Sequence, residues 1–313
     1  MKALVYTRPG DLEFIEVDEP RPAPGEVLVE VAAAGICGSE LEGVASRSPF
    51  RVPPLVMGHE FAGRRLDTGE AVIINPLVAC GDCDQCRRGL PNVCRHRAIL
   101  GIQRPGGFAE RVAAPEHNLY PAPSGLPWQA AALVEPVANA VHGLRRLGAE
   151  RPRRLGIIGG GTIGLVSLLA ASRQGIAEID VAELAEERQA LAARLGATRV
   201  AARLEGEYDA VIDAVGATAT RAASVDHVRP GGVAVWLGLH GPDPAFDAQA
   251  FIRTEKAVVA SFCYDPEDFA EAIRLTAQID PFWVTSIPLS EGAEVFSDLM
   301  NGRTDLFKVQ LVP

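Results

Sequence analysis

The chain has 313 residues, a formal net charge of −10, 48% hydrophobic residues and 22% charged residues. This length suggests about two domains, and the composition is that of a globular protein, which excludes disorder, collagen-like repeats and coiled coils. The acidic charge argues against nucleic acid or an anionic membrane surface as a partner. The first residues are not typical of a signal peptide and no segment predicts a membrane span, so we expect a cytoplasmic protein.

The predicted elements fall into two kinds along the chain. Up to about residue 125 the sequence is rich in Pro, Gly and short alternating runs such as 27–31 and 71–74, which predict a β-rich barrel or sandwich. A helical stretch, broken by Pro136, covers 129–147, and strands then alternate with helices. Strands are expected at 155–158, 179–182, 208–215 and 233–237, and helices at 163–173 and 185–195. This alternation predicts a parallel sheet with crossover helices.

The end of the chain, like its beginning, predicts mostly short strands. From about Phe282 the sequence predicts short strands, one helix at 290–300 and a last strand at 308–312. Because β-rich sequence occurs at both ends, we predict one domain interrupted by the other. The outer domain would comprise residues 1–136 and 268–313, and the inner domain residues 137–267.

Four of the six cysteines lie close together in a loop, at Cys80, Cys83, Cys86 and Cys94. Four thiolates at this spacing can converge on one Zn²⁺ and leave no open position, which predicts a structural zinc. An iron–sulfur cluster would favour a shorter last spacing and a proline after the last cysteine, where Arg95 stands. Unliganded thiols or disulfides are the third alternative, and the lack of an export signal disfavours disulfides. We expect Cys263 to be an ordinary buried thiol.

A second set of ligand types is spread over three segments. Cys37 follows the strand at 27–31, His59 and Glu60 follow an apolar segment, and Glu135 precedes Pro136. One thiolate, one imidazole and one or two carboxylates suit Zn²⁺ and leave a position for water or substrate. Zinc there would lower the pKa of a bound alcohol. Taken singly, each residue could be structural: a core cysteine, a hydrogen-bonded loop histidine, a helix-end carboxylate.

A glycine turn joins the strand at 155–158 to the helix at 163–173. In this context Gly159-x-Gly161-x-x-Gly164 predicts a site where backbone and helix N-terminus bind a pyrophosphate. The expected contacts are Gly159, Gly161, Thr162, Ile163 and Gly164.

An acidic residue ends the next predicted strand. Glu183 can accept hydrogen bonds from both hydroxyls of the adenosine ribose and would repel a 2′-phosphate, which favours NAD over NADP. Two alternatives stay open. Arg188 could swing toward a phosphate, and Glu183 could be a solvated charge at a strand end.

In the order and spacing of these motifs, the chain resembles the zinc-dependent medium-chain dehydrogenases of the alcohol, polyol and threonine dehydrogenase type. The resemblance covers nearly the whole length. It rests on 35–40, 58–60, the four cysteines, 106–110, 135–136, the glycine turn and 308–311. It implies an α/β fold class, in which a Rossmann doubly wound parallel sheet (137–267) is inserted in a GroES-like β-barrel catalytic domain with a zinc lobe at 80–94.

The resemblance also assigns roles at the zinc site. Cys37 and His59 would be ligands of the catalytic zinc, and Glu60 a ligand or a neighbour that exchanges on and off the metal. Glu135 would hold the remaining ligand position, as in polyol-type members. Ser39 would be the first acceptor of the alcohol proton.

At the cofactor, the resemblance implies that Val215 and Leu237, at strand ends, line the nicotinamide. Two zinc ions per chain and NAD, with NADP as the alternative, would be the cofactors. The reaction implied is reversible hydride transfer between NAD(H) and a secondary alcohol or polyol. The partners expected are a small-molecule alcohol or ketone and further copies of the chain in a homodimer or homotetramer.

Two positions depart from the family pattern, and one of them is Glu40, which stands where the family usually has Asp. Many members have a histidine five residues after the ligand cysteine, and this chain has Glu42 there, so we expect Glu42 or water to take the proton from Ser39. Arg47, Arg51 and Arg104 could meet an anionic substrate or be surface residues. The alternative functions are a dehydrogenase of a specialised secondary-metabolite alcohol, such as an aminocyclitol or sugar phosphate, and a non-enzymatic NAD-binding protein.

Overall fold

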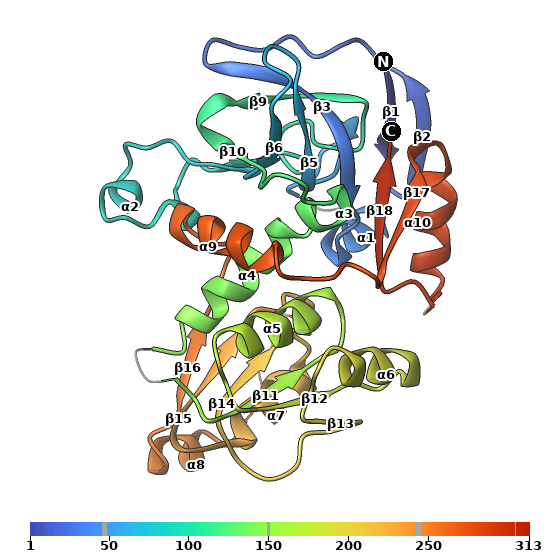
Figure 1. Cartoon of the computed structure of the whole chain (residues 1–313). Helices are drawn as coiled ribbons and strands as arrows, with labels where there is room; N and C mark the ends of the chain where they lie inside the picture. The colour runs from blue at the N-terminus through green and yellow to red at the C-terminus, as the bar shows by residue number, and fades with distance from the viewer. Residues whose placement is uncertain (46–48, 149–150, 242–245, 304) are drawn as a thin grey trace. The chain divides into compact units, whose positions relative to one another are not determined.

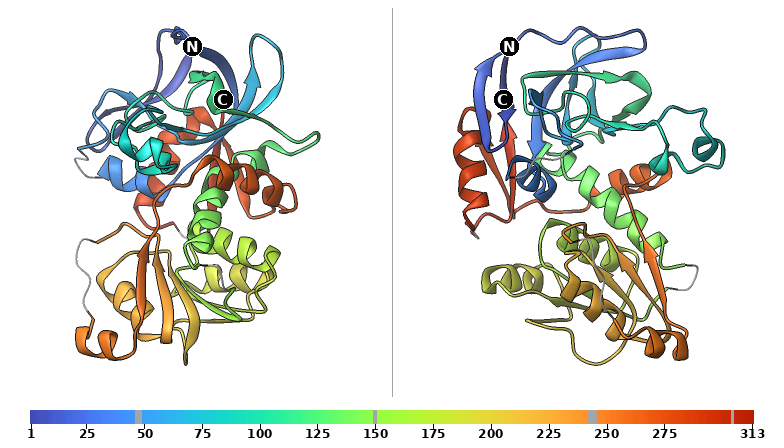
Figure 2. Two further views of the ribbon diagram at one scale, coloured as in Figure 1. Left: turned by 90° about the vertical axis from the view of Figure 1, so that its left-hand side faces the viewer. Right: turned by 180° about the vertical axis from the view of Figure 1, so that it is seen from behind.

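The computed structural model describes residues 1–45, 49–148, 151–241, 246–303 and 305–313 (Figure 1). They form two compact units, one from Met1–Glu135 and Ala272–Pro313 and the other from Pro136–Glu271. Both chain ends lie in the first unit, near strands β1 and β18 (Figure 2). No helix in the described parts of the chain is long and apolar enough to cross a membrane.

The first unit is built on two larger sheets. In the three-stranded sheet, β1 (Lys2–Arg8) lies between β2 (Asp11–Glu16) and β4 (Leu55–Val56). The seven-stranded sheet has the order β10 (Leu119–Pro121), β6 (Ala71–Ile74), β5 (Glu60–Arg65), β3 (Glu26–Gly35), β18 (Lys308–Val312) and β17 (Val284–Pro288), with β9 (Arg111–Pro115) also paired to β3. The antiparallel pairing of β18 with β3 places the end of the chain in the middle of a sheet begun by the N-terminal segment.

Apolar side chains from both ends of the sequence form the core of this unit. Phe108 packs edge-on against Phe296 of α10 (Gly292–Met300), with ring centroids 5.8 Å apart and an interplanar angle of 80°. Leu4 and Leu311 are fully buried in the same cluster. The other elements are α1 (Gly38–Ala45), β7 (Leu77–Val78), α2 (Asp84–Arg87), β8 (Ala98–Ile99), α3 (Trp128–Ala131) and three short 3₁₀ helices at Pro91–Val93, Glu116–Asn118 and Leu289–Glu291.

The predicted helix break at Pro136 is displaced in the structure. Helix α3 ends at Ala131, and α4 (Val134–Arg145) begins two residues before the proline. Pro136 therefore lies in the first turn of α4, where the missing N–H costs no intrahelical hydrogen bond. The interruption falls at Ala132–Leu133 instead.

The second unit is a parallel six-stranded sheet with helices. The strand order is β13 (Arg199–Ala201), β12 (Glu178–Ala182), β11 (Arg154–Ile158), β14 (Tyr208–Asp213), β15 (Val228–Trp236) and β16 (Ala257–Ala260). Its helices are α5 (Thr162–Arg173), α6 (Glu186–Arg194), α7 (Thr218–Asp226), α8 (Ala248–Arg253) and α9 (Pro266–Thr276), which runs on into the first unit. The order of connection along the sheet reverses between β11 and β14, which makes the carboxyl ends of these strands the place for a ligand.

Cys263, expected to be buried, is partly exposed and has a φ of 49°.

Candidate active site

The four lobe cysteines come together on the loop between β7 and β8. Their sulfur atoms all lie within 4.8 Å of one another. The Cys83–Cys86 and Cys80–Cys94 pairs are 3.5 Å apart, and Cys83–Cys94 are 3.8 Å apart. A metal–sulfur distance of about 2.3 Å in a tetrahedron gives sulfur–sulfur edges of roughly 3.8 Å, so the set fits one zinc ion.

Backbone N–H groups donate to the sulfur atoms of Cys83 and Cys94 in this loop, whereas the pKa values of the Cys80 and Cys86 thiols are raised. The amide N–H groups of Cys80 and His96 point at the Cys94 sulfur, at 3.4 and 3.3 Å. Backbone donors, chiefly that of Cys86, lower the pKa of the Cys83 thiol to about 6. A deprotonated thiol is the form that binds a metal.

A second group of ligand atoms joins Cys37, His59 and Glu60, again within 4.8 Å of one another. Cys37 follows β3, and Glu60 opens β5. These strands are antiparallel neighbours that pair Gly35 with Glu60, which is why residues far apart in sequence meet here. Glu135 is buried in the first turn of α4, but it is not a member of this group of ligand atoms.

Glu40, a buried residue of α1, fixes the His59 ring. Its Oε1 lies 2.9 Å from His59 Nδ1 and accepts from the Gly58 N–H at 2.9 Å, while Oε2 accepts from the Cys37 N–H at 3.0 Å. Burial by itself lowers the pKa of His59, but the negative charges of Glu40 and Cys37 raise it well above its usual value. Because Nδ1 is taken by Glu40, Nε2 is the nitrogen left for a metal.

Glu60 has a buried cation beside it. Lys308 of β18 donates its Nζ to the Glu60 carboxylate and to the Ile36 carbonyl at 2.8 Å, and both charged side chains are almost fully buried. Gly35 leaves room for this carboxylate, because a Cβ there would lie 2.2 Å from Glu60 Oε2. The sequence contained Lys308 within a family segment but gave no reason to pair it with Glu60.

The hydroxyl of Ser39 lies next to Cys37. Its Oγ donates to Cys37 Sγ at 3.4 Å and accepts from Arg51 Nη2 at 3.0 Å. Arg51 is also buried, so it belongs to the site and not to the surface. Arg104 pairs with Glu26 instead. Glu42 is exposed on α1, and the third arginine, Arg47, lies outside the described residues.

The glycine turn of the second unit admits no side chains at two positions. Gly159 has a φ of 101°, and a Cβ at Gly164 would lie 1.7 Å from the Gly159 carbonyl oxygen. Thr162 and Ile163 lie between Gly161 and Gly164 and are the first two residues of α5. Backbone and helix N-terminus are thus arranged as phosphate-binding turns require.

Glu183 and Arg188 both lie beside this turn. Glu183 accepts from the Gly160 N–H at 2.7 Å and from the Ala185 N–H at 2.9 Å. The Nη1 atom of Arg188 is 3.9 Å from the position of a Cβ at Gly161. An acidic and a basic side chain therefore both lie beside the glycine turn.

The ends of β14 and β15 bring Val215 and Leu237 close to the same carboxyl edge. Val215 Cγ2 is 2.6 Å from the position of a Cβ at Gly159, so it lies against the glycine turn. Buried Asp213 accepts from the Val215 N–H at 3.0 Å, and its carbonyl accepts from the Leu237 N–H at 3.0 Å. Burial raises the pKa of this carboxyl despite those hydrogen bonds.

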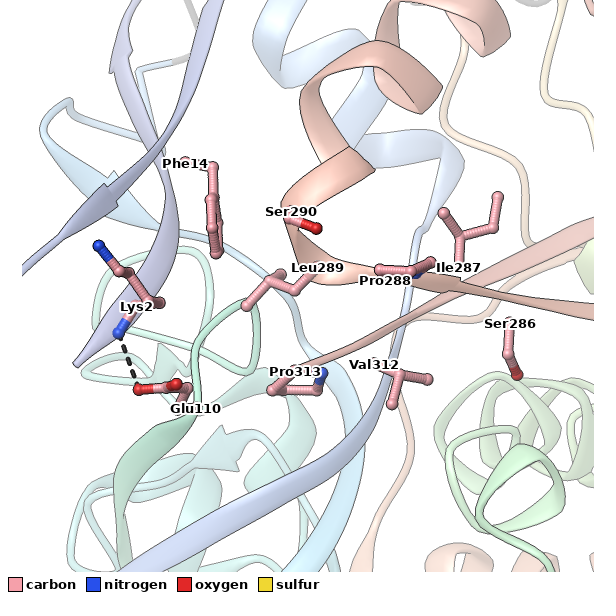
Figure 3. Close-up of a pocket in the computed structure, with 10 residues that line it drawn as sticks. All are labelled: Lys2, Phe14, Glu110, Ser286, Ile287, Pro288, Leu289, Ser290, Val312 and Pro313. Carbon is pink, nitrogen blue, oxygen red and sulfur yellow. Dashed lines mark hydrogen bonds between the residues drawn. The ribbon is translucent and has the colours of Figure 1, made fainter.

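A groove of about 450 Å³ lies elsewhere in the first unit (Figure 3). Phe14, the end of β17 at Ile287–Pro288, and Leu289 give it apolar walls, and the backbone N–H of Lys2 donates to the side chain of Glu110, which also lines it. None of the predicted site residues lines it.

Comparison with known proteins agrees with this fold. The model for the alcohol dehydrogenase GroES-like domain matches residues 23–124, and that for zinc-binding dehydrogenases matches residues 162–278. The L-galactonate-5-dehydrogenase of Escherichia coli K12 is 31% identical over 330 residues, which cover 97% of this chain and 96% of that protein.

Two solved structures are similar over the whole chain. A zinc-binding dehydrogenase of Sinorhizobium meliloti 1021 bound to NADP has a TM-score of 0.93 and 28% identity, covering 100% of this chain and 99% of that one. An alcohol dehydrogenase of Escherichia coli CFT073 complexed with NADH has a TM-score of 0.92 and 26% identity, with the same coverage. The chain belongs to the zinc-dependent medium-chain dehydrogenases, a family of alcohol and polyol oxidoreductases.

Proposed function

We propose that the protein is a zinc-dependent dehydrogenase that transfers a hydride reversibly between NAD(H) and a secondary alcohol or polyol. The observation that carries this proposal is the cluster of Cys37, His59 and Glu60, a thiolate, an imidazole and a carboxylate held by buried partners. Residues 1–136 and 268–313 would form the catalytic domain and residues 137–267 the NAD-binding domain.

The donor set fits Zn²⁺ because its three ligand types are those of open, catalytic zinc sites. Cys37 and His59 would hold the ion, Glu60 would bind it or exchange with it, and Glu135 is the candidate for a further ligand. Bound there, Zn²⁺ supplies Lewis-acid chemistry that makes an alcohol easier to deprotonate. The four lobe cysteines would hold a second, structural zinc.

Ser39 moves the proton in this scheme. Its Oγ accepts the proton of the substrate hydroxyl and releases its own toward Glu42 or water. Val215 and Leu237 would line the nicotinamide ring, and NAD, when bound, would supply the acceptor for the carbinol hydride.

Glu183 supports NAD as the cofactor, because its carboxylate would repel a 2′-phosphate. The test compares kcat/KM for NAD and NADP in the natural chain, in Glu183→Ala and in Arg188→Ala. We expect a preference for NAD that Glu183→Ala reduces by roughly tenfold, equal to about 1.4 kcal/mol, and that Arg188→Ala leaves in place. A marked preference of the natural chain for NADP would overturn the assignment.

The reaction itself is tested by cofactor reduction with a panel of alcohols, polyols and sugar phosphates, together with zinc analysis. We expect turnover of at least one secondary alcohol or polyol and about two zinc ions per chain. One zinc ion would mean that one of the two metal sites is wrongly assigned. Finding iron and visible absorption would instead show that the four lobe cysteines hold an iron–sulfur cluster.

A further inference from the structure

Arg51 is a buried residue next to the proposed catalytic residues, and the proposed reaction gives it no role. Arg51 precedes β4, and only 7% of its surface is exposed. Its Nε is buried without a hydrogen-bond partner among the described residues. Burying a guanidinium with an unsatisfied donor costs folding free energy, so we expect Arg51 to have a function at this position.

The contacts of Arg51 lead to the site and not to solvent. Nη2 donates to Ser39 Oγ at 3.0 Å. Ser39 Oγ in turn lies 3.4 Å from Cys37 Sγ, so Arg51 contacts the serine that adjoins a candidate zinc ligand.

The helix that carries Ser39 leaves room for this arginine. Gly43 lies inside α1, where glycine is an unfavourable residue. A Cβ at Gly43 would lie 2.8 Å from Arg51 Cδ and 3.3 Å from Nε. The close approach of the arginine stem therefore depends on the missing side chain.

A serine hydroxyl has one proton to donate and two lone pairs to accept hydrogen bonds. In this structure the proton points to Cys37 Sγ and one lone pair accepts from Arg51. One lone pair of Ser39 Oγ is left, and its direction is fixed until the hydroxyl proton leaves Cys37 Sγ for Glu42 or water during the reaction.

We propose that Arg51 is a positioning residue that holds the Ser39 hydroxyl so that its remaining lone pair receives the proton of the substrate alcohol. This inference rests on the proposed function. Arg51 is too enclosed to receive an anionic group of the substrate, so its effect passes through Ser39. Because guanidinium stays charged, Arg51 does not itself carry the proton.

The test is a double-mutant cycle between Arg51 and Ser39. Arg51→Met is expected to lower kcat by about 10- to 100-fold, with KM for NAD and zinc content unchanged, because misplacing a reacting group is enough to slow the reaction this much. In a Ser39→Ala background the same substitution should cause no further loss. Arg51→Lys should restore part of the rate, and Arg21→Met, which removes an exposed arginine of the same unit, should change nothing.

Gly43→Ala gives a second route that keeps the charge of Arg51. The added Cβ displaces the arginine, so kcat should fall, while alanine favours the helix and the melting temperature should not drop on that account. An equal loss from Arg51→Met in the natural and Ser39→Ala backgrounds would refute the proposal, as would full activity in Gly43→Ala.

Crystal structures without substrate provide a readout that does not depend on turnover. In Arg51→Met and Gly43→Ala, Ser39 Oγ should leave Cys37 Sγ and adopt more than one rotamer. An unchanged, single Ser39 rotamer in both variants would also overturn the role of Arg51. If the natural chain oxidises no alcohol at all, the proposed function fails, whereas these structures still decide whether Arg51 orients Ser39.

Discussion

The two groups of candidate metal ligands in the first unit differ in what surrounds them. The lobe has four cysteines on one loop, and the ion pair beside it, Arg95–Asp84 at 2.6 Å, is largely exposed. The group of Cys37, His59 and Glu60 draws on separate segments, and its ligands are held by buried Glu40 and Lys308. A closed site is organised by its own metal and a short loop. An open site must keep its ligands in place from behind, because the vacant position leaves them less constrained.

The largest effect is expected from His59→Ala. We assign the chemistry to Cys37, His59 and Glu60 and none to the four lobe cysteines, so turnover should fall by more than about 10³-fold, in line with the several kcal/mol that a catalytic metal contributes. The measurements are steady-state rates, circular dichroism for folding and zinc analysis, which should drop by one ion per chain. Exposed His117→Ala is the matched control and should keep full activity. Retained turnover in His59→Ala would refute the catalytic zinc.

The second effect concerns the buried partner of Glu60. Lys308→Met leaves the Glu60 carboxylate buried without its cation, which typically costs about 3–5 kcal/mol of the free energy of unfolding. Chemical unfolding should show this loss, and Glu60→Gln combined with Lys308→Met should recover much of it. Lys2→Met removes an exposed lysine that pairs with Glu16 and should change stability by less than about 1 kcal/mol. Equal small effects of both lysine variants would show that the buried pair is not needed.

The third effect should stay local to the lobe. Cys83→Ser removes one of the four sulfurs, so one zinc ion should be lost while the main core cluster, to which the lobe residues do not belong, stays folded. We expect a stability loss of about 1–2 kcal/mol, turnover within roughly threefold of the natural chain, and new proteolytic cleavage between residues 80 and 97. Global unfolding of Cys83→Ser would contradict this independence of the two groups.

Much of the fold could be predicted from the sequence where the pattern is regular. The strands at 71–74 and 308–312 have the predicted limits, and the interruption of a β-rich unit by an α/β unit follows from the change of texture. Strand β3 is longer than predicted, because Ala32–Gly35 have no alternation of their own and are extended by pairing with β5 and β18. Non-local pairing of this kind leaves no local signal.

Some features of the candidate site could likewise be predicted from the sequence, and others could not. The ligand types at Cys37, His59 and Glu60 follow from the residues and the family resemblance. The pairing of Glu60 with Lys308 joins residues 248 positions apart, and no periodicity connects them. The burial of Arg51 depends on the missing side chain of Gly43 in three dimensions, so its loop alone suggested either a surface residue or a contact to an anionic substrate.

The smallest effect is expected at Glu42, which stands where many family members have a histidine. Its side chain is exposed on α1, so water can reach the place of its carboxylate and take the proton from Ser39 when Glu42 is absent. Glu42→Ala should therefore change kcat by less than about twofold, which corresponds to roughly 0.4 kcal/mol, and leave the pH profile unshifted. A tenfold loss, or a shifted acid limb of the pH profile that Glu42→Gln reproduces, would instead make the carboxylate the proton acceptor. The site at Cys37, His59 and Glu60 would then depend on a surface charge as well as on the buried charges of Glu40 and Lys308, which the four lobe cysteines do not.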